Sequence, residues 1–167
     1  MMGYVFAVAA MRDGREVTYL PSYGAEMRGG TANCTVVVSD EEIFSPVASS
    51  PDCAVIMNKP SLLRYENLMK QGAVMFLNSS VIDRTPVRDD LHDVHIPAND
   101  IARKLGSDRV TNMIMLGAFV AKTRLTSLES IMNGLQENVK GKSGTVMKLN
   151  RKALDMGADY VLKGTAS

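Results

Sequence analysis

The run Cys53-Ala54-Val55-Ile56-Met57-Asn58-Lys59-Pro60-Ser61 combines a strand with the beginning of a helix. Residues 53–57 are apolar and partly β-branched, which favours a buried strand. Pro60 suits the first turn of a helix, where its missing N–H removes no hydrogen bond, and the side chains of Asn58 and Ser61 suit helix capping. The run therefore predicts a strand followed directly by a helix, as in α/β proteins.

The alternation of β-branched runs with amphipathic runs continues on both sides of this stretch, which predicts an α/β fold. The expected strands are Glu16–Leu20, Cys34–Ser39, Cys53–Met57, Ala73–Leu77 and Asp93–Ile96. The expected helices are about Gly3–Arg12, Ser61–Lys70, Asn99–Leu105, Val110–Lys122, Ser127–Asn138 and Thr145–Leu162. Because the 167 residues contain no repeat, linker or low-complexity tract, residues 1–167 are expected to form a single domain.

Several helix ends have local signals in the sequence. Gly72 is expected to be the C′ residue of the helix before it, and Gly106 is expected to stop the next helix. Thr126 and Glu129 have the spacing of a capping box. Gly157 interrupts the last helical run and could break it.

The first part of the chain departs from a simple doubly wound pattern. About thirteen residues join the first two expected strands, which is short for a helical crossover. These strands are therefore compatible with antiparallel pairing or with separate places in a mixed sheet. The chain also begins directly in a helix, whereas a doubly wound fold normally begins with a strand.

The composition argues against several functional classes. The formal net charge of +1 creates no global field that would favour nucleic acid or an anionic membrane. The most apolar stretch, residues 110–120, is too short for a membrane span and contains Asn112. No secretory signal is recognisable. We therefore expect a globular protein with neither a nucleic-acid nor a membrane partner.

The cysteines and histidines give no sign of a metal site or of a catalytic group. Cys34 and Cys53 are 19 positions apart in apolar strand-like runs, which predicts buried thiols in a reducing cytoplasm. Two cysteines cannot supply the four thiolates of an iron–sulfur cluster. His92 and His95 would lie on opposite faces of a strand, so we interpret them as surface histidines. No catalytic or metal-binding residue is assigned.

Three polar segments follow expected strands, and ligands gather at the carboxyl ends of parallel strands. In the longest, residues 21–33, Gly29 and Gly30 permit close approach of the backbone, and Arg28 offers a fork of donors for carboxylate or phosphate. A glycine turn with solvated charges explains the same residues. The candidate contact residues of this segment are Tyr23, Glu26, Arg28, Gly29, Gly30 and Thr31.

The other two polar segments are Asn58–Ser61 and Asn78–Ser80. Asn58 suits a helix cap, and Asn78 and Ser79 suit a turn or a cap. Their amides and hydroxyls could also contact a ligand at the edge of the sheet. Asn58, Asn78 and Ser79 are therefore further candidates for contact with a ligand or a partner.

Beyond these patterns, the chain resembles a known family. The run Leu20-Pro21-Ser22-Tyr23-Gly24-Ala25-Glu26-Met27-Arg28-Gly29-Gly30-Thr31-Ala32-Asn33-Cys34 resembles the gamma subunit of 2-oxoacid:ferredoxin (2-oxoacid:acceptor) oxidoreductases. The resemblance covers most of the chain to about residue 135, through Ser39-Asp40-Glu41-Glu42-Ile43, Met57-Asn58-Lys59-Pro60-Ser61, Asn78-Ser79-Ser80, Ile96-Pro97-Ala98 and Asn112-Met113-Ile114-Met115-Leu116-Gly117-Ala118. Residues 26–33 are more similar to the 2-oxoglutarate and branched-chain enzymes than to the pyruvate enzymes.

The resemblance implies a three-layer α/β/α domain with a mixed, largely parallel sheet. These enzymes oxidatively decarboxylate a 2-oxoacid with coenzyme A to an acyl-CoA and pass the electrons to ferredoxin. The resemblance places thiamine diphosphate, magnesium and iron–sulfur clusters on partner alpha, beta and, in some enzymes, delta subunits, and no cofactor on this chain. The chain would then be a non-catalytic subunit of a cytoplasmic heteromeric complex, and its candidate residues would contact a partner or coenzyme A.

The sequence departs from the family pattern at its start. Family members usually open with a strand and a Gly-x-Gly-Gly-Gln-Gly-Val loop, and Met1-Met2-Gly3-Tyr4 stands where the tail of that segment should be. The domain is therefore expected to lack the usual first strand. Two alternatives stay open: the small subunit of an indolepyruvate oxidoreductase, and a stand-alone anion- or nucleotide-binding regulatory domain with residues 28–31 as its site.

Overall fold

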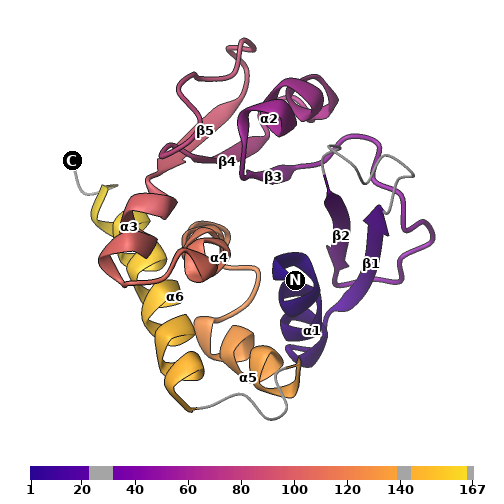
Figure 1. The fold of residues 1–167 in the computed structure, drawn as a ribbon. Helices are drawn as coiled ribbons and strands as arrows, with labels where there is room; N and C mark the ends of the chain where they lie inside the picture. Colours follow the sequence, from indigo (N-terminus) through magenta and orange to yellow (C-terminus); the bar gives the residue numbers. More distant parts are fainter. Residues whose placement is uncertain (23–31, 139–143, 165–167) are drawn as a thin grey trace. The chain divides into compact units, whose positions relative to one another are not determined.

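The computed structural model describes residues 1–22, 32–138 and 144–164. The chain divides into two compact units, which are Met1–Ser49 with Leu125–Lys140, and Ser50–Arg124 with Gly141–Ser167. The α/β class is confirmed, and the expected strands and helices are present with ends shifted by at most two residues, with one exception (Figure 1). The helix expected at Ser61–Lys70 is wrong in its second half, because the α-helix ends at Tyr65 and a 3-10 turn follows at Glu66–Leu68. The assignment of residues 1–167 to a single domain stays a prediction.

The first unit contains an antiparallel two-stranded sheet next to helix α1 (Met2–Arg12). Strands β1 (Glu16–Ser22) and β2 (Asn33–Ser39) pair in a register that places Tyr19 opposite Val36. Both side chains lie on the face of the sheet that α1 covers. Antiparallel pairing, one of the two arrangements compatible with the short connection, is therefore the one observed.

Helix α5 (Leu128–Asn138) packs on α1, and a polar clamp joins the two helices. Asp13 at the end of α1 accepts hydrogen bonds from the hydroxyls of Ser130 and Thr126, each at 2.5 Å. Burial alone would raise the pKa of Asp13, but the bonds from Ser130 and Thr126 outweigh it and lower that pKa.

The capping box predicted at Thr126 and Glu129 is wrong. The hydroxyl oxygen of Ser127 accepts the hydrogen bond from the backbone N–H of Ser130 at 2.9 Å, so Ser127 caps α5. The Thr126 hydroxyl instead donates to the Asp13 carboxylate, one residue before the observed cap. The Thr126 side chain therefore makes a contact with a residue distant in sequence instead of the predicted capping box.

The second unit is built on a parallel three-stranded sheet with the order β3-β4-β5. The strands are β3 (Cys53–Ile56), β4 (Val74–Asn78) and β5 (His92–Ile96). Their register aligns Val55, Phe76 and Val94 across the sheet. Parallel and antiparallel strands are both present, as expected, but they form two sheets in the described residues rather than one.

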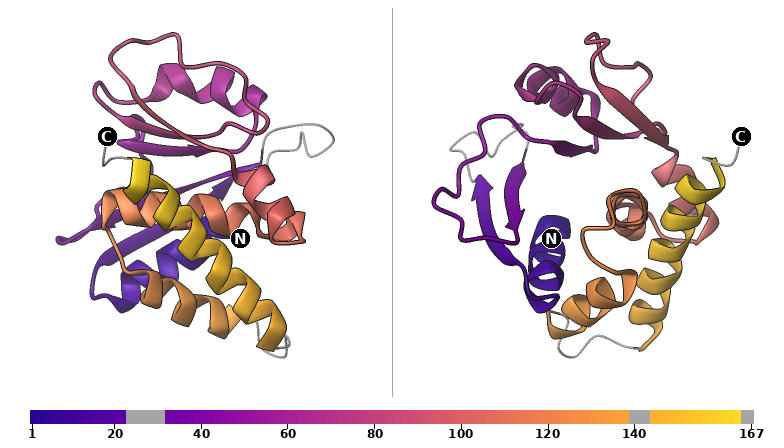
Figure 2. Two further views of the ribbon diagram at one scale, coloured as in Figure 1. Left: turned by 90° about the vertical axis from the view of Figure 1, so that its left-hand side faces the viewer. Right: turned by 180° about the vertical axis from the view of Figure 1, so that it is seen from behind.

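Helices cover both faces of the parallel sheet (Figure 2). On one face, α2 (Lys59–Tyr65) covers a buried apolar core that includes Leu77. On the opposite face, Phe76 packs edge-on against Phe119 of α4 (Thr111–Thr123), with the ring centroids 5.4 Å apart. Because successive strand residues point to opposite faces, this unit has the expected three-layer order.

The connection from β4 to β5, residues 79–91, is described throughout and contains no helix. It is held by Glu66, the first residue of the 3-10 turn η1 (Glu66–Leu68), whose side chain is buried. The Glu66 carboxylate accepts hydrogen bonds from the Arg84 guanidinium at 3.0 and 3.1 Å and from the Val87 N–H at 3.2 Å. A buried carboxylate is stable only when it is paired in this way.

The rest of the second unit is helical. It consists of α3 (Ala98–Lys104), the 3-10 turn η2 (Asp108–Val110), α4 and the long helix α6 (Gly144–Gly164). Helices α4 and α6 pack along each other, and at two places their backbones approach closely. A Cβ atom on Gly117 would overlap the carbonyl of Leu154, and one on Gly157 would overlap the carbonyl of Ile114.

Gly157 therefore does not break the last helix, contrary to one expectation. It lies inside α6, where the absence of a Cβ atom allows the helix to pack closely against α4. Gly72 is also not a C′ residue, because α2 ends at Tyr65, several residues earlier. With φ of 73°, Gly72 instead forms the turn before β4. Gly106, with φ of 80°, follows α3 as expected.

The expectation of two buried thiols is wrong for Cys34, which is exposed, whereas Cys53 is half-buried. The reason is that β2 belongs to a sheet of only two strands, so Cys34 is shielded chiefly by Gly3 of α1. Partial burial nonetheless raises the pKa of both thiols. In the described ranges, no helix is both long and apolar enough to cross a membrane.

Replacing either contact glycine should destabilise the chain. Gly117→Ala and Gly157→Ala should each lower the free energy of unfolding by roughly 1–3 kcal/mol, because the new methyl group must displace the backbone of the facing helix. Gly144→Ala is the matched control, since no atom lies within 4 Å of its Cβ position. Urea unfolding of the three variants measures the effect, and equal stability of all three would contradict the close contact.

Candidate functional site

The structure describes three of the nine candidate contact residues. The six candidates in segment 21–33 lie outside the described residues, and their role stays a prediction. The other three, Asn58, Asn78 and Ser79, all belong to the second unit. They lie where parallel strands end, as the sequence predicts: Asn58 follows β3, Asn78 ends β4, and Ser79 follows it.

Asn78 is the central polar residue of this edge. It is only 1% exposed, and its amide nitrogen donates to the Asn99 side-chain oxygen at 2.7 Å. The Ser79 N–H donates to the carbonyl of Ile96 at 2.9 Å. These two bonds join the carboxyl end of β4 to the segment that follows β5.

The side-chain oxygen of Asn78 is buried and accepts no hydrogen bond within the described part of the chain. An unpaired buried acceptor of this kind is destabilising by about 1–3 kcal/mol, so native proteins rarely retain one. A donor from a bound molecule would satisfy this oxygen. Asn78 is therefore the strongest of the three described candidates for ligand contact.

Asn58 has the structural role that the sequence predicts. Its side-chain oxygen accepts from the backbone N–H of Ser61 at 3.0 Å, so it caps α2. The next residue, Lys59, donates to Asp83 at 2.8 Å, and this hydrogen bond lowers the pKa of Asp83. The Asn58 oxygen is thus already in use by its own helix.

Two further residues of the edge, Asn99 and Asp100, were not among the predicted candidates. The Ser80 hydroxyl donates to the Asp100 carboxylate at 2.8 Å, and the Asp100 N–H donates to the Ser80 hydroxyl oxygen at 3.2 Å. Both lie in the first turn of α3, and only their contacts with β4 and the residues after it place them at this edge. Amides, hydroxyls and paired carboxylates suit binding by hydrogen bonds rather than covalent chemistry.

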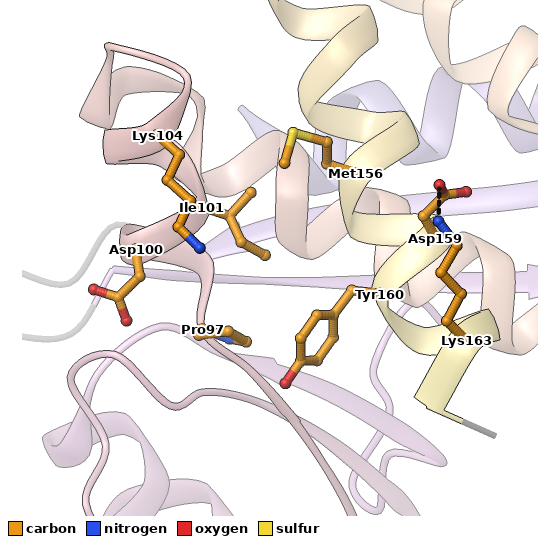
Figure 3. Close-up of a pocket in the computed structure, with 8 residues that line it drawn as sticks. All are labelled: Pro97, Asp100, Ile101, Lys104, Met156, Asp159, Tyr160 and Lys163. Atoms are coloured by element: carbon orange, nitrogen blue, oxygen red, sulfur yellow. Dashed lines mark hydrogen bonds and ion pairs between the residues drawn. The ribbon is translucent and has the colours of Figure 1, made fainter. Parts of the chain in front are cut away.

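A cavity of about 320 Å³ lies beside this edge, between α3 and α6 of the same unit (Figure 3). Ile101 and Met156 face each other across it, with Tyr160 next to Pro97. The remaining lining residues are charged: Asp100, Lys104, Asp159 and Lys163. No local sequence pattern predicts this cavity, because it depends on the packing of α6 against α3.

The two histidines, His92 and His95, both lie in β5. His95 contacts Asp93 through a ring nitrogen at 2.6 Å. Among the described residues, no group of three or more His, Cys, Asp or Glu side chains is placed to hold a metal ion. The polar edge and the cavity are therefore the features of this unit that favour ligand binding.

An α/β chain with this arrangement can be compared with known proteins. Residues 1–160 match the family model for pyruvate ferredoxin/flavodoxin oxidoreductase, and the chain belongs to this family. The chain is 34% identical to the ketoisovalerate oxidoreductase subunit VorA of Methanothermobacter marburgensis over 97% of its own length and 34% of VorA. It is 32% identical to the 2-oxoglutarate synthase subunit KorC of the same organism, over 93% of the chain and 86% of KorC.

The chain thus spans about a third of the length of VorA but most of KorC. Among solved structures, the gamma subunit of a keto/oxoacid ferredoxin oxidoreductase from Geobacter sulfurreducens matches with a TM-score of 0.82 at 27% identity. That match covers 97% of this chain and 90% of the other. The resemblance to gamma-type subunits seen in the sequence is confirmed.

Removing the Asn78 side chain should destabilise the second unit. Asn78→Ala removes the hydrogen bond to the half-buried Asn99 side chain and leaves space at a buried position, but it also removes the unpaired Asn78 oxygen, so the net fall in the free energy of unfolding should be about 1 kcal/mol. Ser79→Ala is the control, because the Ser79 side chain makes no hydrogen bond in the described part of the chain, and its effect should stay within about 0.5 kcal/mol. Chemical denaturation of both variants measures the effect, and an Asn78→Ala variant as stable as Ser79→Ala would contradict the predicted net loss.

Proposed function

We propose that the chain acts as the gamma-type subunit of a 2-oxoacid:ferredoxin oxidoreductase and has no activity alone. The observation that carries this proposal is the match to KorC, which extends over 93% of this chain and 86% of that subunit. Because the chain matches nearly the whole of KorC, which is one subunit of its enzyme, a role as the corresponding subunit explains the match best.

The proposed reaction converts a 2-oxoacid anion, coenzyme A and two oxidised ferredoxins to an acyl-CoA, carbon dioxide, two reduced ferredoxins and one proton, which comes from the coenzyme A thiol. Thiamine diphosphate, magnesium and the iron–sulfur clusters belong, in this proposal, to partner alpha, beta or delta subunits. The present chain would contribute binding surface. A cytoplasmic location is part of the same proposal and agrees with the two free cysteines, Cys34 and Cys53.

The proposed substrate is 2-oxoglutarate or a branched-chain 2-oxoacid. The names of KorC and VorA support these two classes, and the run 26–33 supports them independently. The indolepyruvate subunit is less favoured because IorB of Archaeoglobus fulgidus is 25% identical to this chain, against 32% for KorC, over a similar share of both chains. The stand-alone regulatory domain is not favoured because it does not explain a match along a whole enzyme subunit. Comparing turnover of 2-oxoglutarate, ketoisovalerate, pyruvate and indolepyruvate by the complete complex distinguishes the substrate classes.

Two parts of the chain are proposed to contact coenzyme A or a partner subunit. One is the predicted segment with Tyr23, Glu26, Arg28, Gly29, Gly30 and Thr31, where the guanidinium suits a phosphate. The other is the polar edge of the second unit, where the unpaired oxygen of Asn78 can accept a hydrogen bond. Asn58 and Ser79 flank this edge and would contribute backbone or hydroxyl contacts.

The isolated chain should give no turnover with a 2-oxoacid, coenzyme A and a viologen dye. Adding the thiamine-binding and cluster-binding subunits from the same organism should give dye reduction, and this reduction should require both the 2-oxoacid and coenzyme A. The control omits this chain from the mixture, and activity should then fall at least about tenfold. Turnover by the chain alone, or full activity without it, would overturn the proposal.

A further inference from the structure

The segment between β2 and β3 exposes large apolar side chains. Residues 40–47, Asp40-Glu41-Glu42-Ile43-Phe44-Ser45-Pro46-Val47, form neither helix nor strand. Phe44 is 92% exposed and Val47 is 66% exposed. Aromatic side chains that remain in water in a free chain are the kind that dominate binding when they enter a partner's pocket.

The segment makes contacts near both of its ends. At its start, Asp40 forms an ion pair with Arg15, and the Glu41 N–H donates to the Ser39 hydroxyl oxygen at 3.0 Å. Near its end, the Val47 N–H donates to the Ser45 hydroxyl oxygen at 3.3 Å. These contacts restrict the backbone locally near residues 39–41 and 45–47, and a backbone that is restricted before binding loses less entropy on binding.

The charge of the segment indicates what kind of surface would receive it. Glu41 and Glu42 precede Phe44, are exposed, and have no side-chain partner among the described residues. The whole first unit is acidic, with eight Asp and Glu residues against four Lys and Arg residues. A complementary receptor would therefore be an apolar pocket with a basic rim.

We propose that segment 40–47 is a docking segment that inserts Phe44 and Val47 into an apolar, basic-rimmed pocket on another subunit of the oxidoreductase. The inference rests on the proposed function, since it requires a partner subunit. Phe44 supplies the apolar anchor. Glu41 and Glu42 orient the approach and raise the association rate.

The test measures affinity between the full-length chain and the co-purified thiamine-binding and cluster-binding subunits of the same source. Phe44→Ser should weaken binding by roughly 30-fold or more, as loss of an aromatic anchor does. Val87→Ser is the matched control, because Val87 is 78% exposed but belongs to the second unit, and its effect should stay within about threefold. The double variant Glu41→Gln with Glu42→Gln should slow association several-fold and flatten its dependence on salt.

The possible outcomes separate this inference from the proposed function. If the wild-type chain does not bind those subunits, the proposed function itself fails and the docking segment fails with it. If the wild-type chain binds and Phe44→Ser binds equally well, or Val87→Ser is weakened as much, only the docking segment is overturned.

Two measurements on the chain without partners test whether Phe44 instead packs against its own chain or against a second copy of the chain. The melting temperature of Phe44→Ser should equal that of the wild type, and a clear decrease would show that Phe44 packs within its own chain and overturn the proposal. Sedimentation should give the same mass for both proteins. A wild-type dimer that becomes a monomer in Phe44→Ser would identify a second copy as the occupant, and the proposal would again be wrong.

Discussion

The close contact between α4 and α6 is the constraint on which the second unit depends. At Gly117 and Gly157 each helix approaches the backbone of the other, so a residue with a Cβ atom at either position would force the two helices apart. Helix α4 then places Phe119 under Phe76 and covers one face of the parallel sheet. Helix α6 forms one wall of the cavity beside α3. A shift of this helix pair would therefore change both the sheet layer and the cavity.

The polar edge at the carboxyl ends of the strands follows from this packing. The parallel order β3-β4-β5 places Asn78 next to the first turn of α3, which contains Asn99 and Asp100. On the other face, buried Glu66 holds the long connection between β4 and β5 through Arg84. The edge is consequently fixed from both sides before any ligand is bound, which favours preorganised hydrogen bonding.

The sequence predicted those features that depend on neighbouring residues. The strand-to-helix run at residues 53–61, the Asn58 cap and the Gly106 stop depend on contacts within a few positions, and all three were confirmed. Features that depend on distant residues were missed or misread. Gly157 was interpreted as a helix breaker from its local pattern, because its contact with Ile114 on another helix leaves no signal nearby in the sequence. Thr126 was assigned as a cap from its spacing to Glu129, because its bond to Asp13, 113 positions away, is equally invisible in a local pattern. Asn99 and the α3–α6 cavity were missed for the same reason.

Our central claim is that the chain functions within a heteromeric 2-oxoacid oxidoreductase rather than alone. Native mass spectrometry of the assembly, purified from its source through a tag on this chain, tests the claim most directly. We expect a single complex in which the chain is present together with a thiamine diphosphate-binding chain and iron–sulfur clusters. A mass that corresponds to the chain alone, or to copies of only this chain, would contradict the claim.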